Sequence, residues 1–228
     1  MPARYIALVP AAGIGNRMQS TVPKQYLPLG EKPMLQIVLD TLLATGAIDH
    51  VYLIVAADDP HIDAMLGPST LPKLTVLRCG GATRQQTVSN GLQALGGEVD
   101  ASDWILVHDA ARPGLTSAMV EHLIAAVGDD PVGGILALPM ADTVKRGIDH
   151  RITQTIDRSQ LWSAQTPQMF RHALLQRALQ LAANCTDEAS AVEALGLQPL
   201  LVEGSIFNFK VTRPDDAALA TLVLKGLR

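Results

Sequence analysis

The chain has 228 residues, 48% of them hydrophobic, which supplies enough apolar surface for a sizeable core and excludes a wholly disordered protein. Eighteen basic residues against 22 acidic ones give a formal net charge of −4, and only 4% of the residues are aromatic. A broad basic face or a ladder of stacking platforms for nucleic acid is therefore not expected.

Five short runs rich in Val, Ile and Leu are predicted to be strands, at residues 5–9, 51–56, 74–77, 104–107 and 134–138. None alternates polar with apolar residues, which is typical of parallel strands covered on both faces. Apolar residues recur between the runs at helical spacing, and this order of strands and helices predicts a doubly wound, mostly parallel, Rossmann-like α/β sheet in a single domain over residues 1–228. The recurring apolar residues are Met34, Ile37, Val38 and Leu42, then Val88, Leu92 and Leu95, then Val120, Leu123, Ile124 and Val127.

Residues 142–156 break this rhythm, since apolar residues there are sparse. The segment Gly147-Ile148-Asp149-His150 predicts a turn between two short strands, so we expect a protruding β-arm at about residues 139–158. Such an arm cannot bury both of its faces alone, and either packs on a partner subunit or remains an ordinary surface hairpin.

Residues 171–183 and 187–195 are predicted to be helical. The segment Thr212-Arg213-Pro214-Asp215 resembles a capping box with Pro near the first turn, so it predicts the start of a last helix.

The sequence indicates a reducing, cytoplasmic setting. Cys79 and Cys185 lie far apart and outside any Cys-x-x-Cys pair, which favours two reduced thiols. No apolar stretch reaches the ~18–20 residues of a membrane span, and the first residues do not read as a signal peptide.

A glycine-rich loop, Pro10-Ala11-Ala12-Gly13-Ile14-Gly15-Asn16-Arg17, follows the first predicted strand. Its glycines let the backbone approach a phosphate, and Arg17 and Lys24 add two cations. The third glycine and the nearby acid of a Rossmann dinucleotide fingerprint are missing, as is a Walker A lysine. The loop therefore favours phosphate binding and argues against a nicotinamide-dependent dehydrogenase.

Two further loops follow predicted strands. The segment Gly80-Gly81-Ala82-Thr83-Arg84 opens a helix, where backbone amides are expected to stand free to read a base. The segment His108-Asp109-Ala110-Ala111-Arg112 offers a carboxylate for Mg²⁺ and a guanidinium for a phosphate, whereas His108 is expected to be a packed or orienting residue. With no nucleophile–base pair in evidence, this set indicates phosphoryl or nucleotidyl transfer to a substrate that supplies its own nucleophile.

The segments PAAGIGNRM, PKQY, GGATRQQTV, VHDAARP, TPQ, TDEAS and NFKVTRPDD occur in one order along the chain. Together they resemble the 2-C-methyl-D-erythritol 4-phosphate cytidylyltransferase family of the non-mevalonate isoprenoid pathway. The resemblance implies a nucleotidyltransferase fold and Mg²⁺-dependent transfer of CMP from CTP to methylerythritol phosphate. It also implies a homodimer in which the arm is exchanged, so that residues of the arm serve the neighbour's site.

Carried over motif by motif, the resemblance implies three sets of site residues. The catalytic set is Arg17, Lys24, Asp109 and Lys210, and Asp109 is also the expected metal ligand. The nucleotide-binding set adds Pro10, Ala11, Ala12, Gly13, Gly15, Gly81, Ala82, Thr87 and Ala110. The acceptor-binding set is Asp109, Arg112, Thr143, Arg158, Thr166 and Lys210.

The chain departs from the family's usual sequence in two places. The family usually has Ser at the position of Thr87, and the hydroxyl is kept. Some members have an acid at the position of Ala82, which is therefore expected to act through its backbone. Two alternatives stay open: a ribitol-5-phosphate cytidylyltransferase, which would differ in its acceptor residues, and a non-catalytic CTP-binding module.

Overall fold

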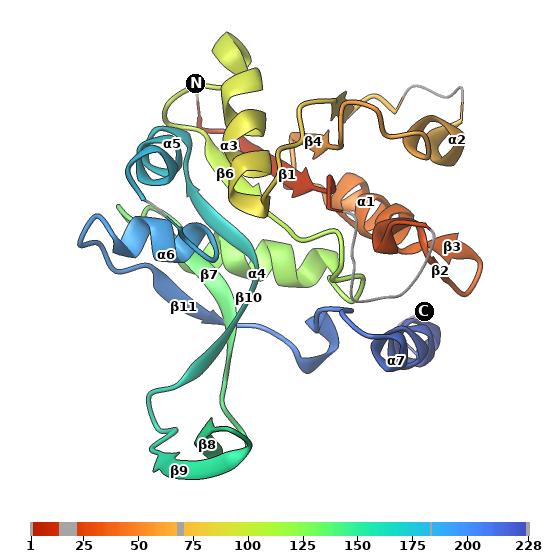
Figure 1. Ribbon diagram of the computed structural model, residues 1–228. Coiled ribbons are helices and arrows are strands. Elements are labelled where there is room, and N and C mark those ends of the chain that lie inside the picture. The colour runs from red at the N-terminus through yellow and green to blue at the C-terminus, as the bar shows by residue number, and fades with distance from the viewer. Residues whose placement is uncertain (1, 14–21, 68–70, 183, 227–228) are drawn as a thin grey trace.

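The computed structural model describes residues 2–13, 22–67, 71–182 and 184–226. Within them, seven strands form one central sheet in the order β11-β7-β10-β6-β1-β4-β5 (Figure 1). The strands β1, β4, β5 and β6 pair in parallel, as do β11 and β7, whereas β10 runs antiparallel to β6 and β7. The prediction of a mostly parallel sheet is confirmed. The bounds are β1 Tyr5–Pro10, β4 His50–Ile54, β5 Leu74–Leu77, β6 Trp104–Val107, β7 Gly134–Pro139, β10 Trp162–Arg171 and β11 Leu200–Glu203.

Helices cover both faces of the sheet, as the apolar runs predicted (Figure 1). Successive strand residues point to opposite faces, so Val9 belongs to the cluster that contains side chains of α1 and α4, while Leu8 belongs to the cluster that contains side chains of α3, α5 and α6. Trp104 and Phe170, on neighbouring strands, are among the largest side chains that are fully buried. The bounds are α1 Met34–Ala44, α3 Arg84–Ala94, α4 Ser117–Val127, α5 His172–Leu181 and α6 Glu188–Glu193.

Smaller elements surround this core. The last helix, α7, packs on β2, and its Ala220 belongs to a small cluster with Leu29 of β2 and Met34 at the start of α1. No helix within the described residues has the length and apolar character that crossing a membrane requires. The bounds are η2 Lys24–Tyr26, β2 Pro28–Leu29, β3 Lys32–Pro33, α2 Ile62–Leu66, η3 Gly96–Glu98, η4 Ile206–Asn208 and α7 Pro214–Gly226.

The predicted arm is present as the hairpin β8 Val144–Ile148 and β9 Arg151–Ile156, which stands away from the sheet (Figure 1). Both residues of its two-residue turn, Asp149 and His150, have positive φ, as a type I′ turn requires. Ile148 and Ile152 on this hairpin are 63% and 70% exposed, so the arm leaves apolar surface uncovered within one protomer.

Several details differ from the sequence-based expectations. The helices expected at 171–183 and 187–195 are shorter, because Arg171 still belongs to β10 and Asp187 caps α6 with its side chain. Pro214 does open the last helix, but the capping acid is Asp216 and not Asp215. The Asp216 carboxylate accepts the backbone N–H groups of Thr212 and Arg213 at 2.8 Å each.

Candidate active site

A cavity of about 670 Å³ lies where β1 and β6 end at their carboxyl termini, the edge at which ligands bind in open α/β sheets. Eleven of the predicted site residues line it. They are Pro10, Ala11, Ala12, Gly13, Lys24, Gly81, Ala82, Thr87, Asp109, Ala110 and Lys210. Gly15 and Arg17, also predicted, lie outside the described residues.

The glycine-rich loop is fixed to its neighbours by its first residue after β1. The Ala11 amide donates to the Ile54 carbonyl oxygen at 2.7 Å, and the Ala11 carbonyl accepts from Nε2 of the buried Gln25 at 2.7 Å. Gln25 follows Lys24 directly, so this bond ties the lysine-bearing turn to the loop. Nζ of Lys24 lies 3.4 Å from the carbonyl oxygen of Val211, the neighbour of Lys210. Two lysines are thus brought to one wall of the cavity.

The second loop packs tightly against the first. A Cβ built on Gly80 would lie 2.8 Å from the Val55 carbonyl oxygen and would collide with the Cβ of Ala12. Glycine at position 80 is therefore needed for the close approach of the two loops.

Hydrogen bonds within the protein occupy the first three amides of the second loop, Gly80-Gly81-Ala82-Thr83. The amide of Gly80 donates to the Val55 carbonyl at 2.9 Å, that of Gly81 to the Thr87 hydroxyl at 3.1 Å, and that of Ala82 to Oε1 of Gln86 at 3.1 Å. The expectation that these amides stand free is therefore wrong. Thr87 holds the loop in shape, since its hydroxyl also donates to the Thr83 carbonyl at 2.9 Å. A ligand at this loop would therefore meet carbonyl oxygens rather than the amides of Gly80, Gly81 and Ala82.

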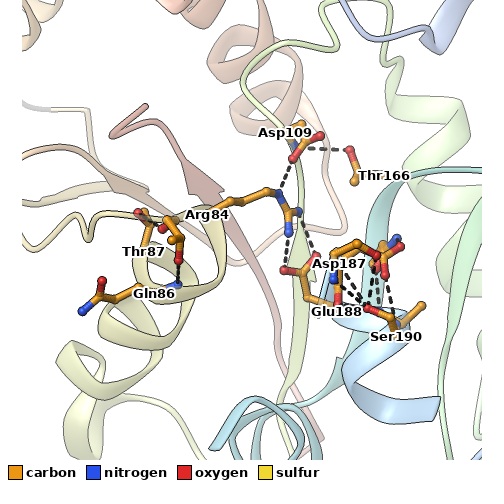
Figure 2. A network of polar contacts seen from close by, with 12 residues as sticks. Arg84, Gln86, Thr87, Asp109, Thr166, Asp187, Glu188 and Ser190 are labelled. Carbon is orange, nitrogen blue, oxygen red and sulfur yellow. Dashed lines mark hydrogen bonds and ion pairs between the residues drawn. The ribbon is translucent and has the colours of Figure 1, made fainter. Parts of the chain in front are cut away.

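Asp109 is the carboxylate of the cavity wall, and three cations lie around it. Figure 2 shows the contact with one of them, Arg84. Oδ1 of Asp109 accepts from Nε of Arg84 at 2.8 Å, its Oδ2 lies 2.7 Å from Nζ of Lys210, and Arg112 Nε lies 3.9 Å away. Burial alone would raise the pKa of Asp109, but Arg84 and Lys210 hold it well below its usual range. The carboxylate is therefore ionised, and Lys210 is held opposite it because the next residue, Val211, donates its amide to the Ala111 carbonyl at 2.8 Å.

His108 sits behind Asp109 in a closed chain of hydrogen bonds. The Asp109 amide donates to the Thr166 hydroxyl at 3.1 Å, and that hydroxyl lies 3.0 Å from Nδ1 of His108. Since a carbonyl oxygen can only accept, Nε2–H of His108 donates to the Arg112 carbonyl at 3.2 Å, and in the neutral ring Nδ1 then accepts from the Thr166 hydroxyl. Burial lowers the pKa of His108 to about 4, so the ring is neutral. The prediction that His108 is a packed residue is confirmed.

The remaining predicted acceptor residues do not line the cavity of one protomer. The Arg112 guanidinium donates to the carbonyls of Asn208 at 2.7 Å and Ala164 at 3.2 Å. Thr166 is buried, and its hydroxyl is bonded to His108 and to the Asp109 amide. Thr143 and Arg158 lie at the two ends of the arm, where Arg158 donates to the Ala141 carbonyl.

Sequence reasoning missed a functional candidate in Arg84. This residue opens α3 directly after the second loop, lines the cavity and joins Asp109 to Glu188 (Figure 2). A cation in the first turn of a helix that follows two glycines is the one local signal that pointed to it. Gln25, Thr83, Ala111 and Thr212 also line the cavity without having been predicted to do so.

A divalent cation fits this site only together with a bound triphosphate. Among the residues that the structure describes, no cluster of three or more His, Cys, Asp or Glu side chains could hold a metal ion. Mg²⁺ at nucleotide sites takes one or two carboxylates and completes its shell with phosphate oxygens and water. Among the described residues that line the cavity, Asp109 is the carboxylate that meets that requirement, with Arg84 and Lys210 sharing its oxygens.

Comparison with known proteins finds close similarity along nearly the whole chain. A family model described as 2-C-methyl-D-erythritol 4-phosphate cytidylyltransferase matches residues 5–226. The protein of that name from Aromatoleum aromaticum is 49% identical over 226 residues, covering 97% of this chain and 95% of its own. The one from Chromobacterium violaceum is 53% identical over 222 residues, covering 96% and 97%.

Solved structures also resemble this chain. A crystal structure described as 4-diphosphocytidyl-2C-methyl-D-erythritol synthase has a TM-score of 0.87 at 43% identity and covers 98% of this chain and 99% of its own. The 2-C-methyl-D-erythritol 4-phosphate cytidylyltransferase of Francisella tularensis has a TM-score of 0.81 at 31% identity, covering 97% and 100%. The similarity therefore includes the fold as well as the sequence.

Proposed function

The chain belongs to the 2-C-methyl-D-erythritol 4-phosphate cytidylyltransferase family, nucleotidyltransferases of isoprenoid biosynthesis, and we propose that its cavity transfers CMP from CTP to 2-C-methyl-D-erythritol 4-phosphate. The observation that carries this proposal is the lining of the cavity. Lys24, Lys210 and the glycine-rich loop gather at one edge of the sheet beside a single ionised carboxylate, Asp109. Cations and a closely approaching backbone suit a triphosphate, and no protein nucleophile is required.

The reaction is a displacement at the α-phosphorus of CTP. A phosphate oxygen of the acceptor forms the new O–P bond, and the bond between the α-phosphorus and its bridging oxygen to the β-phosphate breaks. Pyrophosphate leaves with that electron pair. Negative charge grows on the phosphoryl oxygens and on the leaving group, where Lys24 and Lys210 would stabilise it, together with Arg17. The acceptor phosphate is already ionised near neutral pH, so no general base is needed.

The proposed cofactor is Mg²⁺, held by Asp109 and the phosphates of CTP. When bound, such an ion draws electron density from the phosphoryl group and neutralises charge on the pyrophosphate. Cytosine is proposed to contact the loop at Gly81 and Ala82, whose amides are already bonded inside the chain. Carbonyl oxygens of this loop could instead accept from the exocyclic amino group of cytosine, which is a hydrogen-bond donor.

We propose that the acceptor is held across a homodimer. Thr143 and Arg158 lie on the exposed arm, away from the cavity of their own protomer, while the exposed Ile148 and Ile152 leave the hairpin with an uncovered apolar face. Exchange of the arm would cover that face and bring Thr143 and Arg158 to the partner's Asp109, Arg112 and Thr166. An Arg158→Ala dimer that kept full activity would contradict this arrangement.

We further propose that residues 1–228 act as one catalytic domain in the cytoplasm. The central sheet contains strands from both halves of the chain, and Cys79 and Cys185 are both free, as is usual in a reducing compartment. Recovery of the activity in the cytosolic fraction, and not with membranes, is the expected result.

The test of the function uses CTP labelled at the α-phosphate, Mg²⁺ and two acceptors in parallel. We expect the label to move to 2-C-methyl-D-erythritol 4-phosphate, with an equal amount of pyrophosphate released, and not to ribitol 5-phosphate. Transfer to ribitol 5-phosphate alone would overturn the acceptor assignment while keeping the CTP site. CTP binding without transfer to either acceptor would show a binding module and overturn the enzymatic proposal.

A further inference from the structure

Glu188, in the segment Thr186-Asp187-Glu188-Ala189-Ser190, is a fully buried carboxylate to which the proposed reaction assigns no role. It is the first residue of α6, and it lies on the opposite side of the Arg84 guanidinium from Asp109 (Figure 2). A buried charge is costly unless it is paired, so its partner indicates what it does.

The partner of Glu188 is the guanidinium of Arg84. Nη1 and Nη2 of Arg84 donate to Oε1 and Oε2 of Glu188 at 2.7 and 2.9 Å, a bidentate pair. With the guanidinium in this orientation, Nε–H points at Asp109 and donates to Oδ1 at 2.8 Å. Oδ2 of Asp109 is therefore left to Lys210, 2.7 Å away, on the side of the cavity.

Glu188 itself is held in place by hydrogen bonds at the N-terminus of α6. Asp187 caps the helix, accepting the Ser190 amide at 3.0 Å and a bond from Nε2 of Gln168 at 2.8 Å. Oε1 of Gln168 accepts the Ala189 amide at 2.8 Å. Because Gln168 belongs to β10, these bonds fasten the start of α6 to the sheet, and Glu188 cannot follow Arg84 if the guanidinium moves.

We propose that Glu188 and Arg84 are positioning residues for the Asp109 carboxylate. Glu188 holds the fork of Arg84, formed by Nη1 and Nη2, and so fixes the guanidinium in the orientation in which Nε–H contacts Oδ1 of Asp109 and Oδ2 is left to Lys210 and the substrates. Without Glu188, the same fork is free to close on both oxygens of Asp109, the geometry that guanidinium and carboxylate prefer. This inference rests on the proposed function, because it concerns the presentation of Asp109 to the reactants.

The test is a double-mutant cycle between Glu188→Gln and Asp109→Asn, measured in single turnovers with labelled CTP. Glu188→Gln keeps the shape of the side chain but cannot accept both N–H groups of the fork. We expect the rate to fall by about 10- to 100-fold, the scale for losing a group that orients a functional residue. In the Asp109→Asn background the same substitution should change the rate by less than about threefold, since coupled residues are not additive. Additive losses would overturn the proposal.

A crystal structure of unliganded Glu188→Gln gives a second readout that does not depend on activity. We expect both oxygens of Asp109 to be bonded to Arg84 and the bond to Lys210 to be lost, whereas unchanged contacts of Asp109 would overturn the proposal. If Glu188→Gln does not fold, Arg84→Lys, which keeps the charge but lacks the fork, replaces it in the double-mutant cycle.

The matched control is Gln85→Ala. Gln85 is next to Arg84 on α3 and donates to the Ala182 carbonyl at 2.9 Å, so it also joins α3 to the segment after α5, without touching Asp109. We expect this variant to lose stability and to keep the wild-type rate. A loss of rate equal to that of Glu188→Gln would show a general structural effect and overturn the proposal. Failure of the wild-type enzyme to turn over would instead refute the proposed function.

Discussion

Acidification should destabilise the protein through His108, which is fully buried behind the cavity. Burial lowers the pKa of His108 to about 4 in the folded protein, whereas an unfolded chain has a histidine pKa of about 6.5. Between these values the unfolded state binds more protons than the folded state, so stability rises with pH across this window and falls as the pH drops. For one such group, going from about pH 7 to about pH 5 costs about 2 kcal/mol.

The matched variant is His108→Gln, whose amide can still donate to the Arg112 carbonyl but does not titrate. We expect the variant to be less stable near neutral pH, because the Thr166 hydroxyl loses its acceptor. The difference in free energy of unfolding between wild type and variant should then shrink by about 2 kcal/mol as the pH falls from about 7 to about 5. Urea unfolding at a fixed protomer concentration measures it, since dimer stability depends on concentration. A difference that stays constant across this range would refute the account of His108.

Three further perturbations test the cavity. Lys24→Ala should lower kcat by about 10²- to 10³-fold in steady-state pyrophosphate release, because the charge matters most as the leaving group departs; a rise in KM with kcat unchanged would contradict that role. Gly80→Ala should cost about 1–3 kcal/mol in urea unfolding and weaken CTP binding in calorimetry, since its Cβ has no space beside Ala12 and Val55; a variant as stable as wild type would refute the close packing. A chelator should abolish turnover and added Mg²⁺ should restore it if Asp109 and the phosphates hold the ion; full turnover in the chelator would remove the ion from the mechanism.

The parallel part of the sheet and the site at its edge could be predicted because local sequence determines them. Uninterrupted Val, Ile and Leu runs such as Trp104–Val107 require burial on both faces. Since the carboxyl ends of parallel strands meet at one edge, the loops that carry Gly13, Gly81 and Asp109 had to come together there.

The antiparallel strand β10 could not be predicted in the same way. Its buried half contains Gln165, Thr166 and Gln168, as well as Pro167, a composition that argues against a central strand. These polar side chains are tolerated because each bonds to a partner far away in sequence, as Gln165 does to the Ser205 carbonyl at 2.8 Å. Such partners are visible only in the folded chain.

Contacts between residues that are not adjacent in sequence also explain why the predictions for the site were incomplete or wrong. Arg84 and Glu188 are 104 positions apart, so nothing local showed that one would hold the other beside Asp109. The amides of Gly81 and Ala82 were expected to be free because a glycine pair opens a helix. In the structure Thr87 and Gln86, from the first turn of that helix, fold back and occupy them.

The central claim is that the active site of one subunit is completed by Thr143 and Arg158 from the arm of its partner. A mixed dimer tests this claim most directly. Lys24→Ala and Arg158→Ala protomers, each nearly inactive as a homodimer, are unfolded together in equal amounts, refolded, and assayed for pyrophosphate release with CTP and 2-C-methyl-D-erythritol 4-phosphate. If the arm acts across the two-fold axis, half of the dimers are mixed and each has one intact site, so about a quarter of wild-type activity should return. No recovery in a mixture shown to contain mixed dimers would contradict the account.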